Sequence, residues 1–507
     1  MNTTGFLMIA TIAVYLMTML AIGFRYSKQT SNSEDFYLGG RKMGPLVTAM
    51  SAEASDMSSW LLMGLPGVAY LTGVADAAWT AIGLGIGTWL NWYFVSRRLR
   101  RYSQNIGAIT VPDFFSKRYH DNSNTLNALA ALVIIIFFIP YTASGFAACG
   151  KLFNSLFGVN YTTAMIISAL VIVGYTVMGG FSAVSTTDFV QSIVMTLALI
   201  TVLTFGINTA GGFDAVMVNA QSLSGYLSFT AIHDATTGSA TPYSALSIAS
   251  CLAWGFGYFG MPHILLRFMA IEDEKKLVLS RRIASVWVLI AMTVAIVIGI
   301  VGLGMTKAGA LKFLEGSASE TIIVEIANLI SQHGVLAAIV AGLILAGILA
   351  ATMSTADSQL LAAASSVSQN IVQDFFHVKL NEKQSLRIAR ITIVLISLFG
   401  VLLARDPNSS VFGIVSFAWA GFGGAFGATM LCALFWKRSN KWGALAGMIS
   451  GGATVFIWKY MVRPLGGAWN IYELLPAFFV SLLFIIIVSL ITAAPDEKQN
   501  AEFEAAK

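Results

Sequence analysis

Four carboxylates lie in long apolar stretches of the chain, where ionisable side chains are costly and are usually functional. They are Glu53, Asp56, Asp188 and Asp357, and none has a Lys or Arg in its own apolar run. A counter-charge must come from elsewhere, unless the group holds a proton or contacts water; for Glu53 we favour water in an entrance vestibule. Asp56 and Asp357 lie among Ser and Thr in small-residue segments, which offer the oxygen ligands that hard cations prefer. These segments therefore predict a cation site.

The hydroxyl groups nearest to Asp357 lie in the segment ILAATMSTADSQLL, residues 348–361. Ser354 precedes Asp357 by three residues, so the two share one helix face. Asp188, Asp357 and Ser358 suggest a second cation position, because an ion between two buried carboxylates relieves their repulsion. In the alternative interpretation the hydroxyls bond to their own helix carbonyls, Asp357 caps a turn, and Asp188 is a solvated end of a span.

Aromatic side chains accompany one of the glycine-rich stretches. Trp254 and Tyr258 are spaced i and i+4, on one helix face, and Tyr141 follows Pro140 in another span. Such rings beside a helix break can contact a substrate ring or an ammonium group, and packing alone is the alternative. The sequence contains no nucleophile–base arrangement or phosphate-binding loop, and its three cysteines match neither a disulfide framework nor a zinc site. An enzyme is therefore not predicted.

The elements that position these residues are membrane helices. The chain of 507 residues is 56% hydrophobic and 11% charged, and apolar runs of 18 or more residues mark membrane spans. The first run is not preceded by a positive charge or followed by a cleavage site, so we interpret it as a retained helix. We predict thirteen spans, near residues 6–24, 46–71, 74–95, 125–149, 161–181, 189–209, 243–266, 283–306, 334–358, 388–404, 410–436, 442–461 and 471–492.

The distribution of basic residues predicts the orientation of these spans. With the N-terminus outside and the C-terminus inside, 24 of the 30 Lys and Arg residues, Arg267 among them, fall on the cytoplasmic side. The net charge of +5 is therefore explained by topology, and no nucleic-acid partner is inferred. The whole chain, 1–507, reads as a single transmembrane domain.

Two spans are predicted to be broken. The second holds SAEASDMSSWLLMGLPG, residues 51–67, and the seventh holds AWGFGYFGMPHILLRF, residues 253–268, each with clustered glycines and a proline. Freed backbone groups are tolerated in a bilayer only where they line a cavity in the protein. Because the two spans are five apart, they predict a five-plus-five inverted repeat over about 46–436, with the first and the last two helices peripheral, and a transport site between the repeats.

The chain resembles the sodium/solute symporter family, and within it the sodium/proline symporters. The two broken spans and ILAATMSTADSQLL carry the resemblance, together with YLGGRKMGP (37–45), GYTVMGGFSAVSTTDFVQ (174–191) and FAWAGFGGAFG (417–427). The resemblance implies an all-α protein of about thirteen helices with a leucine-transporter-type core. It also implies sodium as the coupling ion, and neither a cofactor nor an obligatory protein partner is inferred.

Site residues also follow from the resemblance. It implies sodium ligands from the backbone of Ala54, Met57 and Ala351 and the hydroxyls of Ser354 and Thr355, with Asp56 as the essential acidic residue beside them. Tyr141, Trp254, Tyr258 and Pro262 match the proline pocket, and Arg41, Ser58 and Trp60 match other sensitive positions. Asp188, Asp357 and Ser358 resemble a second cation site of some members. The chain departs from the family pattern at Glu53, Ser59 and Met261.

The expected function is sodium-coupled uptake of L-proline through the inner membrane of a bacterium. A sodium symporter for another small carboxylate-bearing solute is the nearest alternative. A cation channel belongs to a different class, and it would need a continuous pore in place of paired broken helices.

Overall fold

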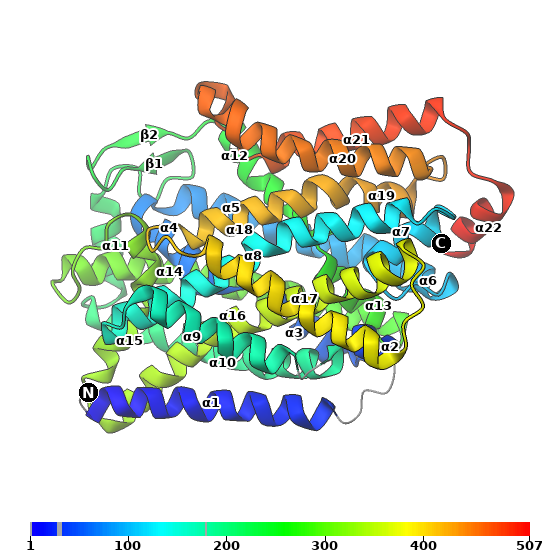
Figure 1. Ribbon diagram of the computed structural model, residues 1–507. Coiled ribbons are helices and arrows are strands. Elements are labelled where there is room, and N and C mark those ends of the chain that lie inside the picture. The colour runs from blue at the N-terminus through cyan, green and yellow to red at the C-terminus, as the bar shows by residue number, and fades with distance from the viewer. Residues whose placement is uncertain (1–2, 28–32, 178–179) are drawn as a thin grey trace.

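The computed structural model describes residues 3–27, 33–177 and 180–507, and it is almost entirely helical. Most helices run along one common direction, and the two termini lie at opposite ends of the bundle (Figure 1). Nine helices in the described ranges are long and apolar enough to cross a membrane.

Each predicted span corresponds to a helical segment. Nine ranges contain the long apolar helices, and the other four, near 46–71, 74–95, 161–181 and 243–266, contain shorter pieces. Residues 178–179 of one predicted span lie outside the described residues. The uninterrupted helices are α1 (Thr3–Ser27), α5 (Val74–Leu90), α8 (Thr125–Phe157), α9 (Tyr161–Thr176), α10 (Phe181–Thr209), α14 (Leu277–Lys307), α16 (Val335–Ser365), α17 (Glu382–Leu403), α20 (Lys441–Ile457) and α21 (Leu474–Ile491).

Both predicted breaks are confirmed. The first separates α3 (Pro45–Asp56) from a π-helical turn η2 (Trp60–Gly64) and α4 (Leu65–Thr72), and Met57 has non-helical φ/ψ of −76° and 67°. The second divides α12 (Ala245–Leu252) and the 3₁₀ segment η4 (Ala253–Gly260) from α13 (Pro262–Ala270) at the extended residue Met261. Pro262 lies in the first turn of α13, where its missing N–H costs nothing.

The glycines of η4 allow the second break to pack tightly. A Cβ on Gly255 would lie 2.4 Å from the carbonyl oxygen of Gly83 in α5, and a Cβ on Gly257 would lie 1.9 Å from Trp419 Nε1. Both distances are far below normal contact, so only glycine lets these backbones approach so closely. The glycines therefore seat η4 directly against α5 and against α18 (Val411–Phe422).

The remaining elements connect the long helices or extend them. A small antiparallel hairpin pairs Ile232 with Thr241 between the predicted spans 189–209 and 243–266. The extensions and connections are α2 (Ser33–Leu38), η1 (Gly39–Arg41), η3 (Asn91–Val95), α6 (Ser96–Asn105), α7 (Val111–Arg118), α11 (Phe213–Ser222), β1 (Ala231–His233), β2 (Ala240–Pro242), η5 (Glu274–Lys276), η6 (Gly316–Thr321), α15 (Ile322–Ser331), η7 (Ser366–Phe375), η8 (Gly423–Gly427), α19 (Ala428–Phe435), η9 (Trp458–Val462), η10 (Arg463–Leu465), η11 (Gly467–Trp469) and α22 (Glu497–Ala505).

The outer surface of the bundle is apolar. Leu170, Leu289 and Ile491 are 68%, 64% and 77% exposed, and many other large aliphatic side chains on the long helices also face outward. A surface of this kind is suited to lipid. Helix α1 lies along one edge of the bundle and packs on α10 and α16, whereas α20 and α21 pair along the opposite edge (Figure 1).

Candidate functional site

The first break brings two of the predicted sodium ligands into direct contact. Ser354 Oγ of α16 donates a hydrogen bond of 2.7 Å to the carbonyl oxygen of Ala54 in the last turn of α3. Ser354 Oγ and Thr355 Oγ1 also lie 3.2 Å and 3.1 Å from the carbonyl oxygen of Ala351. Met57 lies at the break itself. Carbonyl and hydroxyl oxygens from two helices thus converge at one buried point, the chemistry that suits a hard cation.

Asp56 links this point to the second break. Its carboxylate Oδ2 accepts a hydrogen bond of 2.5 Å from the hydroxyl of Tyr258 in η4, and its backbone oxygen accepts one of 3.4 Å from Tyr141 in α8. Asp56 is 5% exposed, and none of the ion pairs among the described residues includes it. A carboxylate buried without a cationic partner is costly, so its position favours a mobile positive charge nearby.

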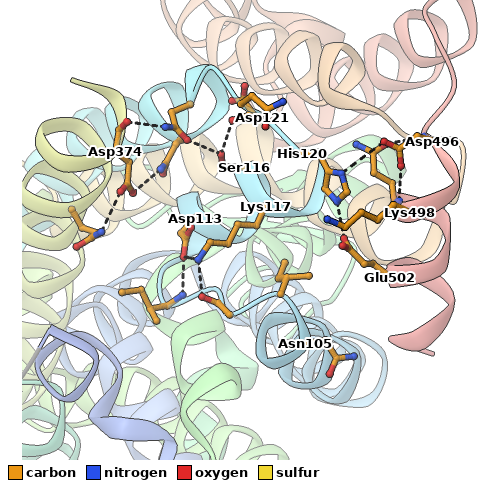
Figure 2. A pocket seen from close by; sticks show the side chains of 18 residues that line it. Asn105, Asp113, Ser116, Lys117, His120, Asp121, Asp374, Asp496, Lys498 and Glu502 are labelled. Carbon is orange, nitrogen blue, oxygen red and sulfur yellow. Dashed lines mark hydrogen bonds and ion pairs between the residues drawn. The ribbon is translucent and has the colours of Figure 1, made fainter. Parts of the chain in front are cut away.

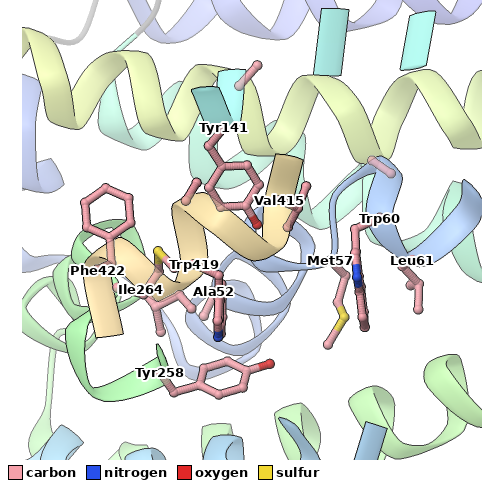
Figure 3. Packing of buried hydrophobic residues seen from close by; sticks show 14 of the residues in the cluster. Ala52, Met57, Trp60, Leu61, Tyr141, Tyr258, Ile264, Val415, Trp419 and Phe422 are labelled. Atoms are coloured by element: carbon pink, nitrogen blue, oxygen red, sulfur yellow. The ribbon is translucent and has the colours of Figure 1, made fainter. Parts of the chain in front are cut away.

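Aromatic rings from different helices line the same small space as Asp56. Figure 3 shows four of them, Trp60, Tyr141, Tyr258 and Trp419. The ring of Trp254 lies 5.8 Å from that of Trp60 and 6.3 Å from that of Trp419, and Tyr258 meets Trp419 edge to face at 5.0 Å. The indole N–H of Trp419 donates to the carbonyl oxygen of Trp254 at 2.8 Å, which fixes α18 against η4. We refer to Trp60, Tyr141, Trp254, Tyr258 and Trp419 as the aromatic cage.

The space inside the cage is small. One cavity of about 10 Å³ is lined by Asp56, Trp60, Leu84, Tyr141, Trp254, Val415 and Trp419. A second of about 10 Å³ lies on the other side of Tyr141 and reaches Ser58 and Thr355. Each has room for about one water molecule, so the cage is closed around Asp56 and must widen to admit any larger solute.

Three further predicted residues make contacts that shape the helix ends. Pro262 does not line either small cavity and acts at the start of α13. Arg41 donates to the backbone oxygens of Met269 and Ala108 at 2.8 Å and 2.6 Å, and so fixes a turn between helix ends. Ser58 Oγ accepts from the backbone N–H of Trp60 at 3.1 Å, which restarts the helix after the break.

The expectation for Glu53 is wrong. We expected water contact in a vestibule, but the side chain is 1% exposed. Its Oε1 accepts a hydrogen bond of 2.9 Å from the indole N–H of Trp92. Glu53 lies on the face of α3 that packs into the protein, and a single acidic residue before a break does not reveal which way that face turns.

The alternative interpretation of Asp188 as a solvated span end is wrong, and its counter-charge comes from another helix. Asp188 is fully buried, and its Oδ2 lies 3.0 Å from Nη2 of Arg267. Arg267 was assigned to a cytoplasmic loop, yet it belongs to α13 and is 1% exposed. The same Nη2 donates to Ser358 Oγ at 2.6 Å, and Ser358 Oγ is 3.4 Å from Oδ1 of Asp357. The three predicted residues of the second cation position therefore gather around a guanidinium.

A much larger cavity lies away from these residues. It has a volume of about 950 Å³ and is lined by polar side chains of α6, α7 and the C-terminal segment that ends in α22 (Figure 2). His120 contacts Glu502 at 2.8 Å across it. Burial raises the pKa of Asp121 beside it, but hydrogen bonds from Lys441 and Ser123 outweigh this effect and leave that pKa below its usual value. The cavity opens at one end of the bundle, so size alone does not identify the binding site.

Trp419 and Arg267 are the functional candidates that the sequence analysis missed. Trp419 lies in FAWAGFGGAFG, where an indole among small residues was the available signal. Arg267 ends the glycine-rich segment of the second break, and its position near a span end made it resemble a loop residue. Both act through partners more than 75 positions away along the chain, at separations of 165 residues for Trp419 and 79 for Arg267.

A membrane protein with two interrupted helices whose breaks meet at buried oxygens and aromatic rings has the features of a secondary transporter. A family model described as the sodium:solute symporter family matches residues 36–451, and this chain belongs to that family. The family consists of transporters rather than enzymes, and sodium is its coupling ion.

Known proteins show similarity over nearly the whole chain. The osmoregulated proline transporter OpuE of Bacillus subtilis (strain 168) is 41% identical over 488 residues, 96% of this chain and 95% of that protein. The sodium/proline symporter of Escherichia coli (strain K12) is 39% identical over 509 residues, 98% of this chain and 96% of that protein.

Solved structures show the same fold. A substrate-bound, outward-open sodium-coupled sialic acid symporter superposes with a TM-score of 0.79 at 19% identity, covering 97% of this chain and 100% of that chain. The nucleobase-cation symporter MHP1 in a closed conformation gives a TM-score of 0.55 at 12% identity, covering 94% and 99%. The fold is therefore one used by sodium-coupled and cation-coupled symporters.

Proposed function

We propose that this chain couples the uptake of L-proline to the entry of sodium across the inner membrane of a bacterium. The observation that carries the proposal is the contact between Ser354 Oγ and the Ala54 carbonyl oxygen, one turn from Asp56 and the aromatic cage. Relatives about 40% identical over nearly the whole length are named for proline transport or for sodium/proline symport, which supports both solutes.

Sodium would bind first at the break in α3. Its ligands would be the backbone oxygens of Ala54, Met57 and Ala351 and the hydroxyls of Ser354 and Thr355. The hydroxyl of Ser354 donates to Ala54 in the present structure, so it would rotate and offer a lone pair to the ion. Asp56 lies beside these ligands and would supply the compensating negative charge without a hydrogen bond of its own to α16.

Proline would bind next in the aromatic cage. Tyr141, Trp254 and Tyr258 would contact its ring, and its carboxylate would approach the N-terminal end of the helix that restarts at Trp60, where backbone N–H groups carry partial positive charge. The cage would widen by movement of α18, because Trp419 closes it from that side. Widening of the cage would link the entry of proline to the contact between the two breaks, which is the hydrogen bond from Tyr258 to Asp56.

The proposed architecture has thirteen membrane helices in a single domain, 1–507, with the N-terminus outside and the C-terminus inside. A five-plus-five inverted repeat over about 46–436 would form the core. Two features support this arrangement: the breaks lie five spans apart, and α1 on one edge and α20 and α21 on the other pack outside that core. Asp188, Asp357 and Ser358 would surround a second positive charge.

The membrane potential supplies the energy. One sodium ion moving inward gains about 2.3 kcal/mol per 100 mV, which supports about fiftyfold accumulation of proline at each 100 mV. The proposal requires no cofactor and no protein partner.

The test is uptake of labelled proline into proteoliposomes with an inward sodium gradient. We expect saturable uptake that collapses when potassium replaces sodium and that excess unlabelled proline abolishes. If another small carboxylate-bearing solute competes better than proline, that solute is the substrate. Sodium current without any solute would indicate the cation channel, and uptake independent of sodium would overturn the coupling.

A further inference from the structure

A buried arginine lies directly beside the proposed sodium site. Arg267 donates from Nε to Ser51 Oγ at 3.1 Å, from Nη1 to the backbone oxygen of His263 at 2.9 Å, and from Nη2 to Asp188 and Ser358 at 3.0 Å and 2.6 Å. Its guanidinium carbon lies 5.0 Å from the centre of the Phe181 ring. One side chain of α13 thus binds α3, α10 and α16 together.

The contacts of Arg267 are in register with the proposed sodium ligands. Ser51 precedes Ala54 by three residues in α3, and Ser358 follows Ser354 by four residues in α16. Residues at these spacings lie on one helix face, about one turn apart. Because Arg267 contacts both Ser51 and Ser358 while Ser354 contacts Ala54, the guanidinium lies about one turn from the proposed sodium ligands along both α3 and α16.

The surroundings of the Arg267 guanidinium resemble those of a bound cation. The guanidinium carries a permanent positive charge, and it is ligated by a buried carboxylate and two hydroxyls, which are oxygen donors of the kind that a sodium ion would use. Asp188 and Ser358 were predicted as ligands of a second cation, and they are the two groups that Nη2 contacts. Ser51 Oγ also donates to Asp188 Oδ2 at 2.6 Å, which completes the cluster.

We propose that Arg267 is a tethered cation, fixed to the protein in the position that a second sodium ion would otherwise fill. The inference rests on the proposed function and adds its coupling ratio: one sodium ion per proline. The second broken helix would then take part in sodium coupling. Its α13 segment carries Arg267, whose positive charge neutralises Asp188 next to α3. When one sodium ion binds at the neighbouring ligands Ala54 and Ser354, the fixed charge of Arg267 prevents a second sodium ion from binding at Asp188.

One feature of the cluster defines the opposing possibility. Asp188 Oδ1 is buried and has no hydrogen-bond partner among the described residues. A sodium ion bound at this oxygen would be present in addition to Arg267, and the wild-type protein would then move two sodium ions per proline. The coupling ratio therefore discriminates between the tethered cation and a second mobile one.

The experiment compares the wild type with R267Q and with the neutral pair R267Q/D188N. Reversal potentials of proline flux in proteoliposomes give the sodium-to-proline ratio. We expect a ratio of one in the wild type, two in R267Q, where sodium replaces the missing charge at Asp188, and one again in R267Q/D188N. A ratio of two in the wild type, or of one in R267Q, overturns the proposal.

A second measurement does not depend on transport. Purified proteins are melted in sodium chloride and in potassium chloride, and we expect sodium to raise the melting temperature of R267Q several degrees more than that of the wild type. R267Q/D188N should lose this excess. If R267Q cannot be recovered folded even at high sodium, sodium does not replace the guanidinium and the proposal fails.

The matched control is R118Q. Arg118 is also 1% exposed and donates from Nε to the backbone oxygen of Ala433, but it forms no ion pair with a carboxylate among the described residues. R118Q should lose stability equally in both salts. Failure of wild-type proline uptake would instead overturn the proposed function, while the melting measurement would still test Arg267 with sodium alone.

Discussion

Asp56 and Asp188 are buried carboxylates that lie next to the same pair of helices, α3 and α16, yet their surroundings differ. Asp188 contacts the guanidinium of Arg267 at 3.0 Å, so its charge is neutralised within the protein. Asp56 has only hydroxyl and backbone partners among the described residues, chiefly Tyr258 at 2.5 Å. The difference supports the proposal that Arg267 compensates Asp188 within the protein, whereas a bound sodium ion compensates Asp56.

The difference follows from where the backbone is broken. Asp188 lies inside the continuous helix α10, where the neighbouring carbonyl groups are used in helical hydrogen bonds, and a side chain from another helix, Arg267, compensates its charge. Asp56 is the last residue of α3, and in that final turn the carbonyl oxygen of Ala54 accepts a hydrogen bond from a side chain of another helix, Ser354. A free cation can therefore be ligated at Asp56 by backbone oxygens, and it can leave again when the break changes shape.

The largest effect is expected from D56N. At about 4 Å, opposite charges interact by on the order of 4 kcal/mol at an effective dielectric constant of about 20, which corresponds to about a thousandfold in sodium affinity. We therefore expect sodium-dependent proline uptake to fall to background. Equilibrium binding of radioactive sodium to the purified variant checks the cause, and unchanged sodium affinity would remove Asp56 from the site.

A large loss of stability, rather than of sodium affinity, is expected from D188N. The variant leaves Arg267 buried without its carboxylate, and breaking one side of a buried ion pair costs about 3–5 kcal/mol. The melting temperature in detergent should fall well below that of the wild type, and the neutral pair R267Q/D188N should recover most of it. Wild-type stability of D188N would mean that the pair does not compensate Asp188.

The surroundings of Asp56 could be predicted in part from the sequence, because they depend on neighbouring residues in the chain. Both breaks follow from glycine and proline within a few residues, and SAEASDMSSW and ILAATMSTADSQ place Asp56, Ser354 and Thr355 in small-residue segments without any knowledge of the fold. The pairing of Ala54 with Ser354 across 300 residues did not follow from spacing, and it rested on resemblance until the structure showed it.

The ion pair between Asp188 and Arg267 could not be predicted from the sequence. Arg267 reaches Asp188 and Ser358 across 79 and 91 residues, and a single arginine near a span end gives no sign of the direction in which it points. Glu53 was misjudged for the same reason, because burial depends on which neighbour covers a helix face. Trp92 covers that face in the structure, from 39 residues away.

A medium effect is expected from Y258F, which separates the hydroxyl of Tyr258 from its ring. The ring keeps its edge-to-face contact with Trp419 at 5.0 Å, while Asp56 loses a hydrogen bond of 2.5 Å. A hydrogen bond to a charged group contributes about 1.5–3 kcal/mol, so the half-saturating sodium concentration should change by about tenfold or more.

Y258A is the matched variant, because it removes the ring as well. We expect it to raise the proline KM beyond that of Y258F, since the cage loses one wall. Uptake titrated with sodium and with proline separates the two effects. Equal proline KM values in Y258A and wild type would place the proline ring elsewhere.

The smallest effect is expected from T355V, which replaces a hydroxyl by a methyl group of similar size. Among the described residues, Thr355 Oγ1 bonds only to the Ala351 carbonyl oxygen of its own helix, at 3.1 Å, whereas Ser354 Oγ also bonds to Ala54 across the break. T355V therefore removes one sodium ligand and leaves the contact between α3 and α16 intact. An ordinary hydrogen-bonding group contributes about 1 kcal/mol, so the half-saturating sodium concentration should rise about fivefold with an unchanged melting temperature.

S354A is the matched variant. It should raise the half-saturating sodium concentration further and also lower the melting temperature, because it loses the sodium ligand together with the contact to Ala54. If the two variants behave alike, the Ala54 contact does not hold the break in place; if neither changes sodium dependence, the ion binds away from α16.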